Sequence, residues 1–285
     1  MAADPRLELV AEVNHHMGSG LRLVGIADHG QSGGAAFVEW PDGRPGVVTR
    51  SSLPMADLAR TAEVLGAARS AGVLVPRHEA FVELTDGVAV VQERLPGRPA
   101  RRTDVEVIDA LLAVTDEFVG LLAERTDVPP PSPHLYESGL EQHSPRSRRL
   151  LRRIHELGDY EMTGTDLVHP DFTVPNVLFD DHGQLSGVVD WNLGAFRGDR
   201  HWALVKLRFD LAWAAAQPGD EQPDTRPEAI ERLDRALETR LEPEVLLAYW
   251  AHWTLTQLHW AVLHDDTAVI DLHLELGESR LLEWR

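Results

Sequence analysis

The sequence predicts an α+β fold, with an antiparallel sheet and one main helix near the N-terminus and a larger helical part after it. Residues 21–93 hold five short runs rich in β-branched or aromatic residues, separated by turn residues. Beyond residue 104, apolar residues recur mostly at helical spacing. The connector Leu95–Gly97 separates the two patterns, so we expect one part over residues 1–95 and another over residues 96–285.

The N-terminal part is expected to form five strands and one helix. The strands are predicted at Leu21–Ile26, Ala35–Trp40, Gly46–Arg50, Glu79–Glu83 and Val88–Glu93. The helix is predicted over Met55–Ala71, because Leu58 and Leu65 belong to an apolar series with a helical period and Gly72 ends it. This part therefore reads as an antiparallel sheet with a single accompanying helix.

The C-terminal part is expected to be mainly helical. The predicted helices are Val105–Arg125, Ser147–Leu157, Trp202–Ala216, Pro227–Arg240, Pro243–His264 and Thr267–Leu282. Residues 167–190 break this pattern, with two short apolar runs beside polar loops. Such an interruption within a helical region is a natural place for functional loops.

Charge and composition narrow the classes of partner. The 285 residues carry a net charge of -19, and residues 96–285 alone hold 34 acidic and 19 basic residues, a net charge of -15. Nucleic acid and anionic membranes are therefore not expected as partners, whereas a cationic small molecule is, although solubility alone would also explain the charge. The absence of cysteine excludes disulfides, and no apolar run approaches the ~20 residues that span a bilayer. We expect a cytoplasmic monomer or homodimer.

The residues that point to chemistry lie between Val168 and Trp191. Asp171 and Asn176 are five positions apart in a loop that leads into an apolar run, and Asp190 follows fourteen positions later at the end of another apolar run. Phosphoryl transfer needs a carboxylate that accepts the proton of the attacking hydroxyl, and an amide oxygen and a second carboxylate that hold Mg²⁺. These three residues supply that set.

This segment resembles the catalytic and metal-binding loops of the aminoglycoside phosphotransferase family, a branch of the protein-kinase-like superfamily. The resemblance implies that Asp171 is the catalytic base, that Asn176 and Asp190 bind magnesium, and that His169 supports the catalytic loop. Pro170 departs from the family, which usually has Gly or Asn there. The resemblance extends over nearly the whole chain and is weakest in the C-terminal third.

The N-terminal part also resembles this family. The glycine-rich stretch between the first two expected strands corresponds to the loop that covers the nucleotide phosphates, and the run ending in Pro96-Gly97 corresponds to the hinge that meets adenine. The nucleotide-binding residues implied by these two segments are Gly30, Ser32, Gly33, Gly34, Gln92, Glu93 and Leu95.

One position departs from the family in an important way. Arg50 ends the third expected strand, where the family usually has a phosphate-binding lysine, and Glu63 lies in the following helix, where the family has the acid that pairs with it. The only lysine of the chain is Lys206, so none is available for this role. We expect Arg50 to replace the lysine, and the alternative is a degenerate nucleotide site.

The resemblance implies an ATP- and Mg²⁺-dependent O-phosphotransferase, with GTP left open as the donor. The expected acceptor is a hydroxylated cationic antibiotic, such as an aminoglycoside, a basic cyclic peptide of the viomycin or capreomycin type, or a macrolide, which the reaction would inactivate to give resistance. The alternatives are a metabolic kinase for choline, an amino alcohol or a sugar, and a non-catalytic nucleotide-binding regulator. Four acids are candidates for lining the acceptor cleft: Asp265, Asp266, Glu275 and Glu278.

Overall fold

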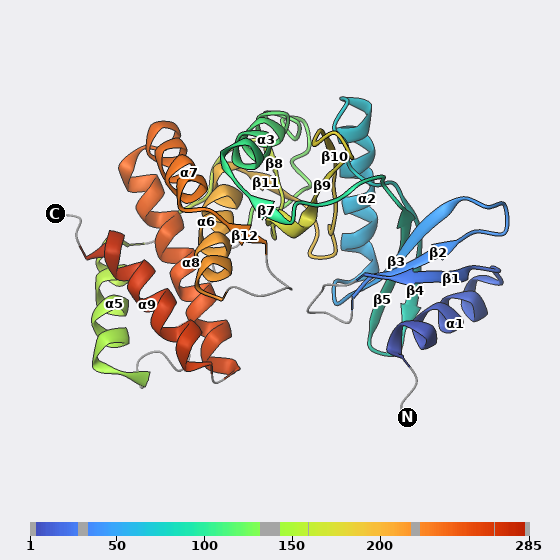
Figure 1. Cartoon of the computed structure of the whole chain (residues 1–285), viewed down its shortest axis with the longest axis horizontal. Coiled ribbons are helices and arrows are strands. Elements are labelled where there is room, and N and C mark those ends of the chain that lie inside the picture. Colours follow the sequence, from blue (N-terminus) through green and yellow to red (C-terminus); the bar gives the residue numbers. More distant parts are fainter. Residues whose placement is uncertain are drawn as a thin grey trace. The chain divides into compact units, whose positions relative to one another are not determined.

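The computed structural model describes residues 4–27, 34–131, 143–158, 160–217, 223–264 and 266–282 (Figure 1). Backbone packing divides the chain into two compact units. The first unit contains residues 1–99, 169–171 and 176–195, and the second contains residues 100–168, 172–175 and 196–285. Asp171, Asn176 and Asp190 thus pack with the sheet of the first unit, although they come late in the sequence. The assignment of separate roles to residues 1–95 and 96–285 stays a prediction.

An antiparallel five-stranded sheet forms the centre of the first unit, as predicted. Its strands run in the order β1-β2-β3-β5-β4, and each pair of neighbours is antiparallel. Their bounds lie close to the predicted ones: β1 Arg22–Ile26, β2 Ala36–Glu39, β3 Pro45–Ser51, β4 His78–Leu84 and β5 Gly87–Glu93.

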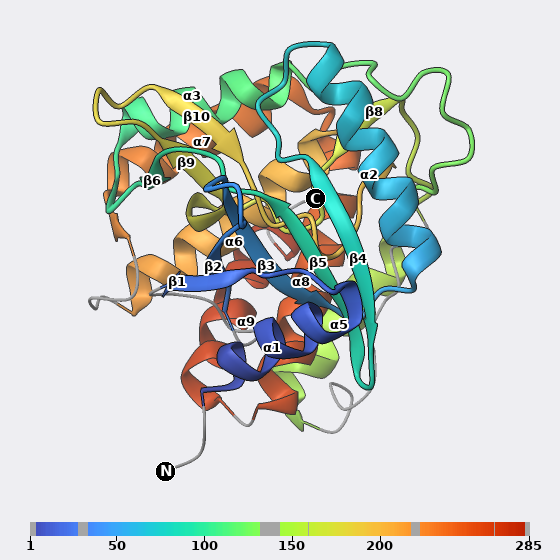
Figure 2. The same cartoon turned by 90° about the vertical axis from the view of Figure 1, so that its right-hand side faces the viewer.

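Helix α1 (Pro5–Met17) is a second helix of the first unit, which the sequence analysis did not predict. Asp4 caps it by accepting a hydrogen bond from the backbone N–H of Arg6 at 2.9 Å, and Gly18 ends it with a φ of 60°. One side of α1 is buried against the sheet (Figure 2). The helix contributes three side chains to that core, which also includes Val48, Ala89 and Val91 of β3 and β5: Leu9, Val10 and Val13.

Helix α2 (Met55–Ser70) lies between β3 and β4 in sequence, as predicted, and packs on the other face of the sheet (Figure 1). Its Leu58 is fully buried against Val88 and Val90 of β5. Val88 and Val90 alternate along β5 with residues of the α1 core, and successive side chains of a strand point to opposite faces. The sheet therefore has an α1 face and an α2 face.

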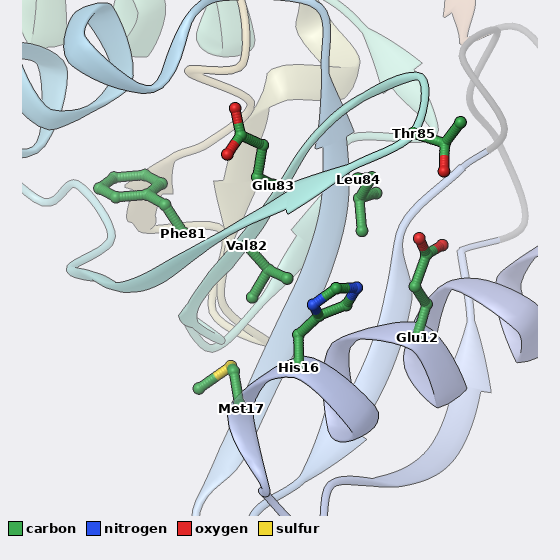
Figure 3. A pocket seen from close by; sticks show the side chains of 8 residues that line it. All are labelled: Glu12, His16, Met17, Phe81, Val82, Glu83, Leu84 and Thr85. Atoms are coloured by element: carbon green, nitrogen blue, oxygen red, sulfur yellow. The ribbon is translucent and has the colours of Figure 1, made fainter.

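A hollow of about 530 Å³ lies between α1 and β4 (Figure 3). Val82 and Leu84 of β4 point toward α1, whereas Phe81 and Glu83 point to the other side of the strand (Figure 3). The lining residues are Glu12, His16, Met17, Phe81, Val82, Glu83, Leu84 and Thr85. Asp171, Asn176 and Asp190 are not among them, so this hollow is separate from the predicted catalytic residues.

A smaller sheet of the first unit carries the predicted catalytic segment. Its strands run in the order β10-β9-β6 and are antiparallel. They are β6 Arg98–Pro99, β9 Val177–Phe179 and β10 Leu185–Val188, and the 3-10 turn η1 (Val174–Asn176) leads into β9. Asn176 thus lies at the start of one strand and Asp190 just beyond the end of its neighbour.

The second unit is mainly helical, as predicted. Its helices are α3 Val105–Asp116, α5 Pro145–Leu157, α6 His201–Ala216, α7 Pro227–Arg240, α8 Pro243–Leu263 and α9 Thr267–Leu281 (Figure 1). Four short strands accompany them: β7 Arg102–Thr103, β8 Asp166–Val168, β11 Phe196–Gly198 and β12 Asp224–Thr225. In the described residues, no helix is both long and apolar enough to cross a membrane.

The helix predicted over Val105–Arg125 is wrong in its second half. α3 ends at Asp116, and the following residues form turns. Gly120 takes a positive φ of 65°, which a helix does not contain, and the N–H of Leu122 donates to the carbonyl of Thr165 at 2.8 Å. A contact with a distant segment therefore replaces the helical hydrogen bonds that the apolar period suggested.

Candidate active site

His169 holds the catalytic segment together from inside the first unit. It is fully buried, and its Nδ1 accepts a hydrogen bond from the backbone N–H of Asp171 at 3.0 Å. Its Nε2 must then carry the proton and donates to the carbonyl of Val189 at 3.0 Å. The ring also packs on Trp191, with 4.3 Å between ring centres. His169 thereby joins the loop of Asp171 to the segment that precedes Asp190.

Asp171 and Asn176 form a closed turn. The Asn176 side chain donates to the backbone carbonyl of Asp171 at 2.8 Å and lies 3.4 Å from Oδ2 of the same residue. The backbone carbonyl of Asn176 accepts from the N–H of Val189 at 2.8 Å. Because its amide nitrogen is engaged in the turn, Asn176 can present its amide oxygen to a cation.

Asp190 is a half-buried carboxylate in an unusual backbone conformation. Its φ of 64° is the one positive value of a non-glycine residue in the described chain. Burial raises the pKa of Asp190, and the negative charge of Asp171 raises it further. Two neighbouring carboxylates of this kind are disfavoured unless a proton or a cation offsets their charge.

Asn192, which the sequence analysis did not single out, links Asp190 to β3. Its Nδ2 donates to Oδ1 of Asp190 at 2.7 Å, and its Oδ1 accepts from the hydroxyl of Thr49 at 2.9 Å. Its backbone carbonyl accepts from the hydroxyl of Ser51 at 2.6 Å. The sequence offered no signal for this contact, because Thr49 and Asn192 are 143 residues apart.

The structure does not bring Arg50 to this loop. Arg50 follows Thr49 on β3, so its side chain leaves the strand on the face of Val48, which packs with α1. Its guanidinium pairs with Asp86 in the turn between β4 and β5. Glu63 lies on α2 with an exposed side chain. The phosphate contact of Arg50 and its pairing with Glu63 therefore stay predictions, and Thr49 and Ser51 are the β3 side chains that reach the Asp190 loop.

The predicted nucleotide-binding residues are described only in part. Gly30, Ser32 and Gly33 lie outside the described residues. Gly34 has a φ of 72°, a conformation that glycine adopts without strain. A residue with a side chain would be strained there, so this position suits a glycine-rich turn between β1 and β2.

The predicted hinge follows β5. Gln92 is 4% exposed, and its Oε1 has no hydrogen-bond partner in the described chain. Glu93 forms an ion pair with Arg69 at 2.9 Å. Leu95 packs directly on Gly187: a β-carbon added to Gly187 would lie only 2.4 Å from Cδ1 of Leu95. The hinge is thus anchored on both sides, while its contact with a nucleotide stays a prediction.

Two of the predicted acceptor-binding acids, Asp266 and Glu278, have structural partners. Asp265 lies outside the described residues. Asp266 caps α9 by accepting from the N–H of Val269 at 3.1 Å, and Glu278 forms an ion pair with Arg146 at 2.8 Å. Glu275 is exposed on α9. Their role in acceptor binding stays a prediction.

The side-chain oxygens of Asn176 and Asp190 suit magnesium. No group of three or more His, Asp or Glu side chains in the described part of the chain could hold a metal ion. Mg²⁺ in nucleotide sites needs only one or two protein carboxylates, because phosphates and water supply its other ligands. The carboxylate of Asp190 and the amide oxygen of Asn176 are hard donors that meet this requirement.

Comparison with known families agrees with this geometry. The model of the phosphotransferase enzyme family APH matches residues 25–202, which include β2 to β11 and the predicted base and metal ligands Asp171, Asn176 and Asp190. The chain belongs to this family. It is therefore a phosphotransferase with the fold of the protein-kinase-like superfamily, as the resemblance implied. No curated protein matches the sequence.

Solved structures of APH-family enzymes share the fold over nearly the whole chain. Aminoglycoside phosphotransferase APH(4)-Ia is 16% identical with a TM-score of 0.68, covering 99% of this chain and 100% of its own. Aminoglycoside-3'-phosphotransferase of type VIII is 21% identical with a TM-score of 0.55, covering 96% and 98%. Macrolide 2'-phosphotransferase MphH from Brachybacterium faecium is 17% identical with a TM-score of 0.54, covering 95% and 97%.

Proposed function

We propose that this APH-family chain transfers the terminal phosphate of ATP, with Mg²⁺, to a hydroxyl group of a cationic small molecule. The observation that carries the proposal is the acidic pair of Asp171 and half-buried Asp190, held on two loops that His169 joins. The amide of Asn176 closes on Asp171 in the same pair of loops. A nucleotide-bound divalent cation would offset the negative charges of Asp171 and Asp190.

Each residue has a distinct part in the proposed reaction. The carboxylate of Asp171 orients the acceptor hydroxyl and takes its proton as the oxygen attacks the phosphate. Asn176 and Asp190 would hold Mg²⁺, which would supply positive charge to the phosphate oxygens. His169 holds the backbone of Asp171 and the backbone just before Asp190 at a fixed separation, because it hydrogen-bonds to both.

An antibiotic is the proposed acceptor class. One supporting observation is the net charge of -15 in residues 96–285, which favours a cation. Another is the fold shared with APH(4)-Ia, whose structures include ternary complexes with hygromycin B and either ADP or AMP-PNP. The fold is also shared with a macrolide phosphotransferase. The aminoglycosides, basic cyclic peptides and macrolides are therefore the first acceptors to test.

A nucleotide-turnover screen tests the function. Purified protein with Mg²⁺ and ATP or GTP is offered aminoglycosides, basic cyclic peptides, macrolides, choline and amino alcohols, and phosphorylated products are identified by mass spectrometry. We expect a cationic antibiotic to be phosphorylated. Turnover of choline or an amino alcohol alone would indicate a metabolic kinase, and nucleotide binding without any turnover would indicate a regulator.

The variant Asp171→Asn tests the assigned base. It should bind nucleotide normally but lose at least ~10²-fold in turnover, since a positioned proton acceptor contributes about that much. Asp181→Asn, which changes an exposed carboxylate in the turn between β9 and β10, is the matched control and should stay active. Full activity of Asp171→Asn would remove Asp171 from the mechanism.

A further inference from the structure

A continuous chain of hydrogen bonds runs from β3 to the carboxylate of Asp190. It starts at the Thr49 hydroxyl, passes through the side-chain amide of Asn192 and ends at Oδ1 of Asp190, over distances of 2.9 and 2.7 Å. Thr49 is 8% exposed, so water has little access to the hydrogen bond between Thr49 and Asn192. Each bond therefore constrains the position of the next group.

The chemistry of the partners fixes the orientation of the Asn192 amide. An ionised carboxylate only accepts hydrogen bonds, so the amide atom that faces Asp190 must be the NH₂ group. The amide oxygen then faces Thr49, whose hydroxyl has to donate. When Asp190 is ionised, as it is with a bound cation, no other choice of donors and acceptors satisfies both contacts, and the hydrogen bonds run in one direction.

The backbone around Asn192 is held independently of this chain. The hydroxyl of Ser51 donates to the Asn192 carbonyl at 2.6 Å, and buried Trp191 donates from its indole to the carbonyl of Val188 at 3.0 Å. These contacts restrain the loop in which Asp190 keeps its positive φ. The carboxylate of Asp190 also accepts a hydrogen bond from the backbone N–H of Asn192. Removing the Thr49 hydroxyl or the Asn192 side-chain amide should therefore loosen the carboxylate of Asp190 without unfolding the loop.

We propose that Asn192 is a positioning residue for magnesium, which aims the carboxylate of Asp190 by transmitting the position of the Thr49 hydroxyl. The inference rests on the proposed function, because it assigns Asp190 to the metal. In this proposal β3 supports the metal site through an uncharged side chain, that of Thr49, which acts through the uncharged side chain of Asn192. The cation at the end of this strand, Arg50, lies on the other face and is paired with Asp86.

The test measures Mg²⁺-dependent nucleotide binding by calorimetry, so it does not depend on finding the acceptor. Loss of a group that orients a metal ligand typically weakens metal affinity by roughly 10- to 100-fold, and we expect such a loss for Asn192→Ala. Thr49→Val replaces the hydroxyl by a methyl group in a side chain of nearly the same shape and should weaken binding by about 3- to 10-fold. Thr49→Ser keeps the hydroxyl and should bind like the natural protein.

A double variant separates positioning from simple packing. If Thr49 acts through Asn192, adding Thr49→Val to Asn192→Ala should cause almost no further loss, whereas independent effects would multiply. Nucleotide affinity without metal and the unfolding temperature should stay nearly constant in Thr49→Val. If Asn192→Ala does not fold, the comparison of Thr49→Val with Thr49→Ser decides the question.

The possible failures can be told apart. A natural protein that binds no Mg²⁺-nucleotide would overturn the proposed function and this inference together. Normal Mg²⁺-nucleotide binding by folded Thr49→Val and Asn192→Ala would overturn the inference alone and leave the function standing. Equal losses in metal-dependent and metal-free binding would also overturn it, because they would show a merely structural role.

Discussion

Thr49 and Arg50 are neighbours on β3 whose side chains leave the strand on opposite faces. Thr49 reaches Asn192, and Arg50 lies on the face of α1 and pairs with Asp86. The side-chain period of a strand is two, so a shift of one residue exchanges the faces. For this reason the run of residues 46–50 predicted the strand correctly from the sequence, but it could not decide which side chain faces the catalytic loops.

The variant Arg50→Ala tests whether Arg50 binds the nucleotide phosphates, as the family resemblance implies, or only pairs with Asp86, as in the structure. A phosphate-binding Arg50 would make this variant lose most of its kcat/KM, as the usual lysine would. Asp86 is 71% exposed, and exposed ion pairs contribute only about 0–1 kcal/mol. If the guanidinium stays on Asp86, Arg50→Ala should change the nucleotide KM by less than about threefold, because an exposed ion pair contributes so little.

Steady-state kinetics of Arg50→Ala, Arg50→Lys and Asp86→Ala, with Thr49→Val as the neighbouring comparison, measure this effect. A rise in the nucleotide KM of more than tenfold in Arg50→Ala, without one in Asp86→Ala, would show that the guanidinium leaves Asp86 to bind phosphate. A gain in activity for Arg50→Lys would instead indicate a damaged lysine position.

Helix α1 shows what a sequence reading misses at the scale of an element. Its end signals are present, since Asp4 and Pro5 begin it and Gly18 ends it. Its leucines do not share one face, however: Leu7 is 52% exposed, whereas Leu9 is 4% exposed. The helix is stable because the sheet offers an apolar face for it, and that face exists only after five strands have paired.

Leu9→Ala tests the contribution of α1 to stability. Leu9 is buried in the core between α1 and the sheet, and truncating a buried Leu costs about 2–5 kcal/mol. We expect the free energy of unfolding in urea to fall by that amount. Leu7→Ala, two residues earlier on the exposed side of α1, is the control and should change the free energy of unfolding by about 0.5 kcal/mol or less. Equal effects of the two substitutions would mean that α1 does not pack as described.

The catalytic loops were more predictable than the elements around them. The spacing of Asp171, Asn176 and Asp190 indicated the loops, because the chemistry restricts both residue type and position. The end of α3 was not predictable, since it depends on a backbone contact between Leu122 and Thr165. Catalytic residue types and their spacing can be predicted from short sequence motifs, whereas hydrogen bonds between distant segments can be known only once the fold is known.

At the scale of the whole molecule, buried histidines link stability to pH. His273 of α9 is 2% exposed, and burial lowers its pKa from 6.5 to about 4, with a smaller effect from the charge of Lys206. Above pH 6.5 the ring is neutral in both the folded and the unfolded chain. Between pH 6.5 and 4 only the unfolded chain takes up the proton, so stability falls as the pH falls, and below pH 4 the loss is complete.

His273→Leu should reduce this pH dependence. One pKa unit corresponds to about 1.4 kcal/mol, so the natural protein should lose about 3 kcal/mol more than the variant between the two pKa values. Urea unfolding at several pH values from 7 down to 4, for both proteins, measures the difference in slope. Parallel curves would show that His273 is protonated in the folded state and that its environment is not as apolar as described.

The net charge of -19 bears on the acceptor. Many acids of the second unit already hold arginines, as Asp116 holds Arg240 and Glu278 holds Arg146. Residues 211–285 nevertheless contain 15 acidic and 6 basic residues, a net charge of -9. This excess attracts cations at a distance, and salt weakens the attraction because the Debye length is only about 10 Å at 0.1 M.

We therefore expect the KM of a cationic acceptor to rise by several-fold when the salt concentration is raised from about 0.02 to 0.3 M, while kcat changes little. The KM of Mg²⁺-ATP should respond differently, because its proposed contacts run through the metal. An N-acetylated form of the same acceptor is the matched control, since it keeps the hydroxyl and loses the charge; its KM should be higher and nearly independent of salt. A neutral preferred acceptor, or a cationic one whose KM ignores salt, would show that the negative charge of the chain serves solubility and not recognition.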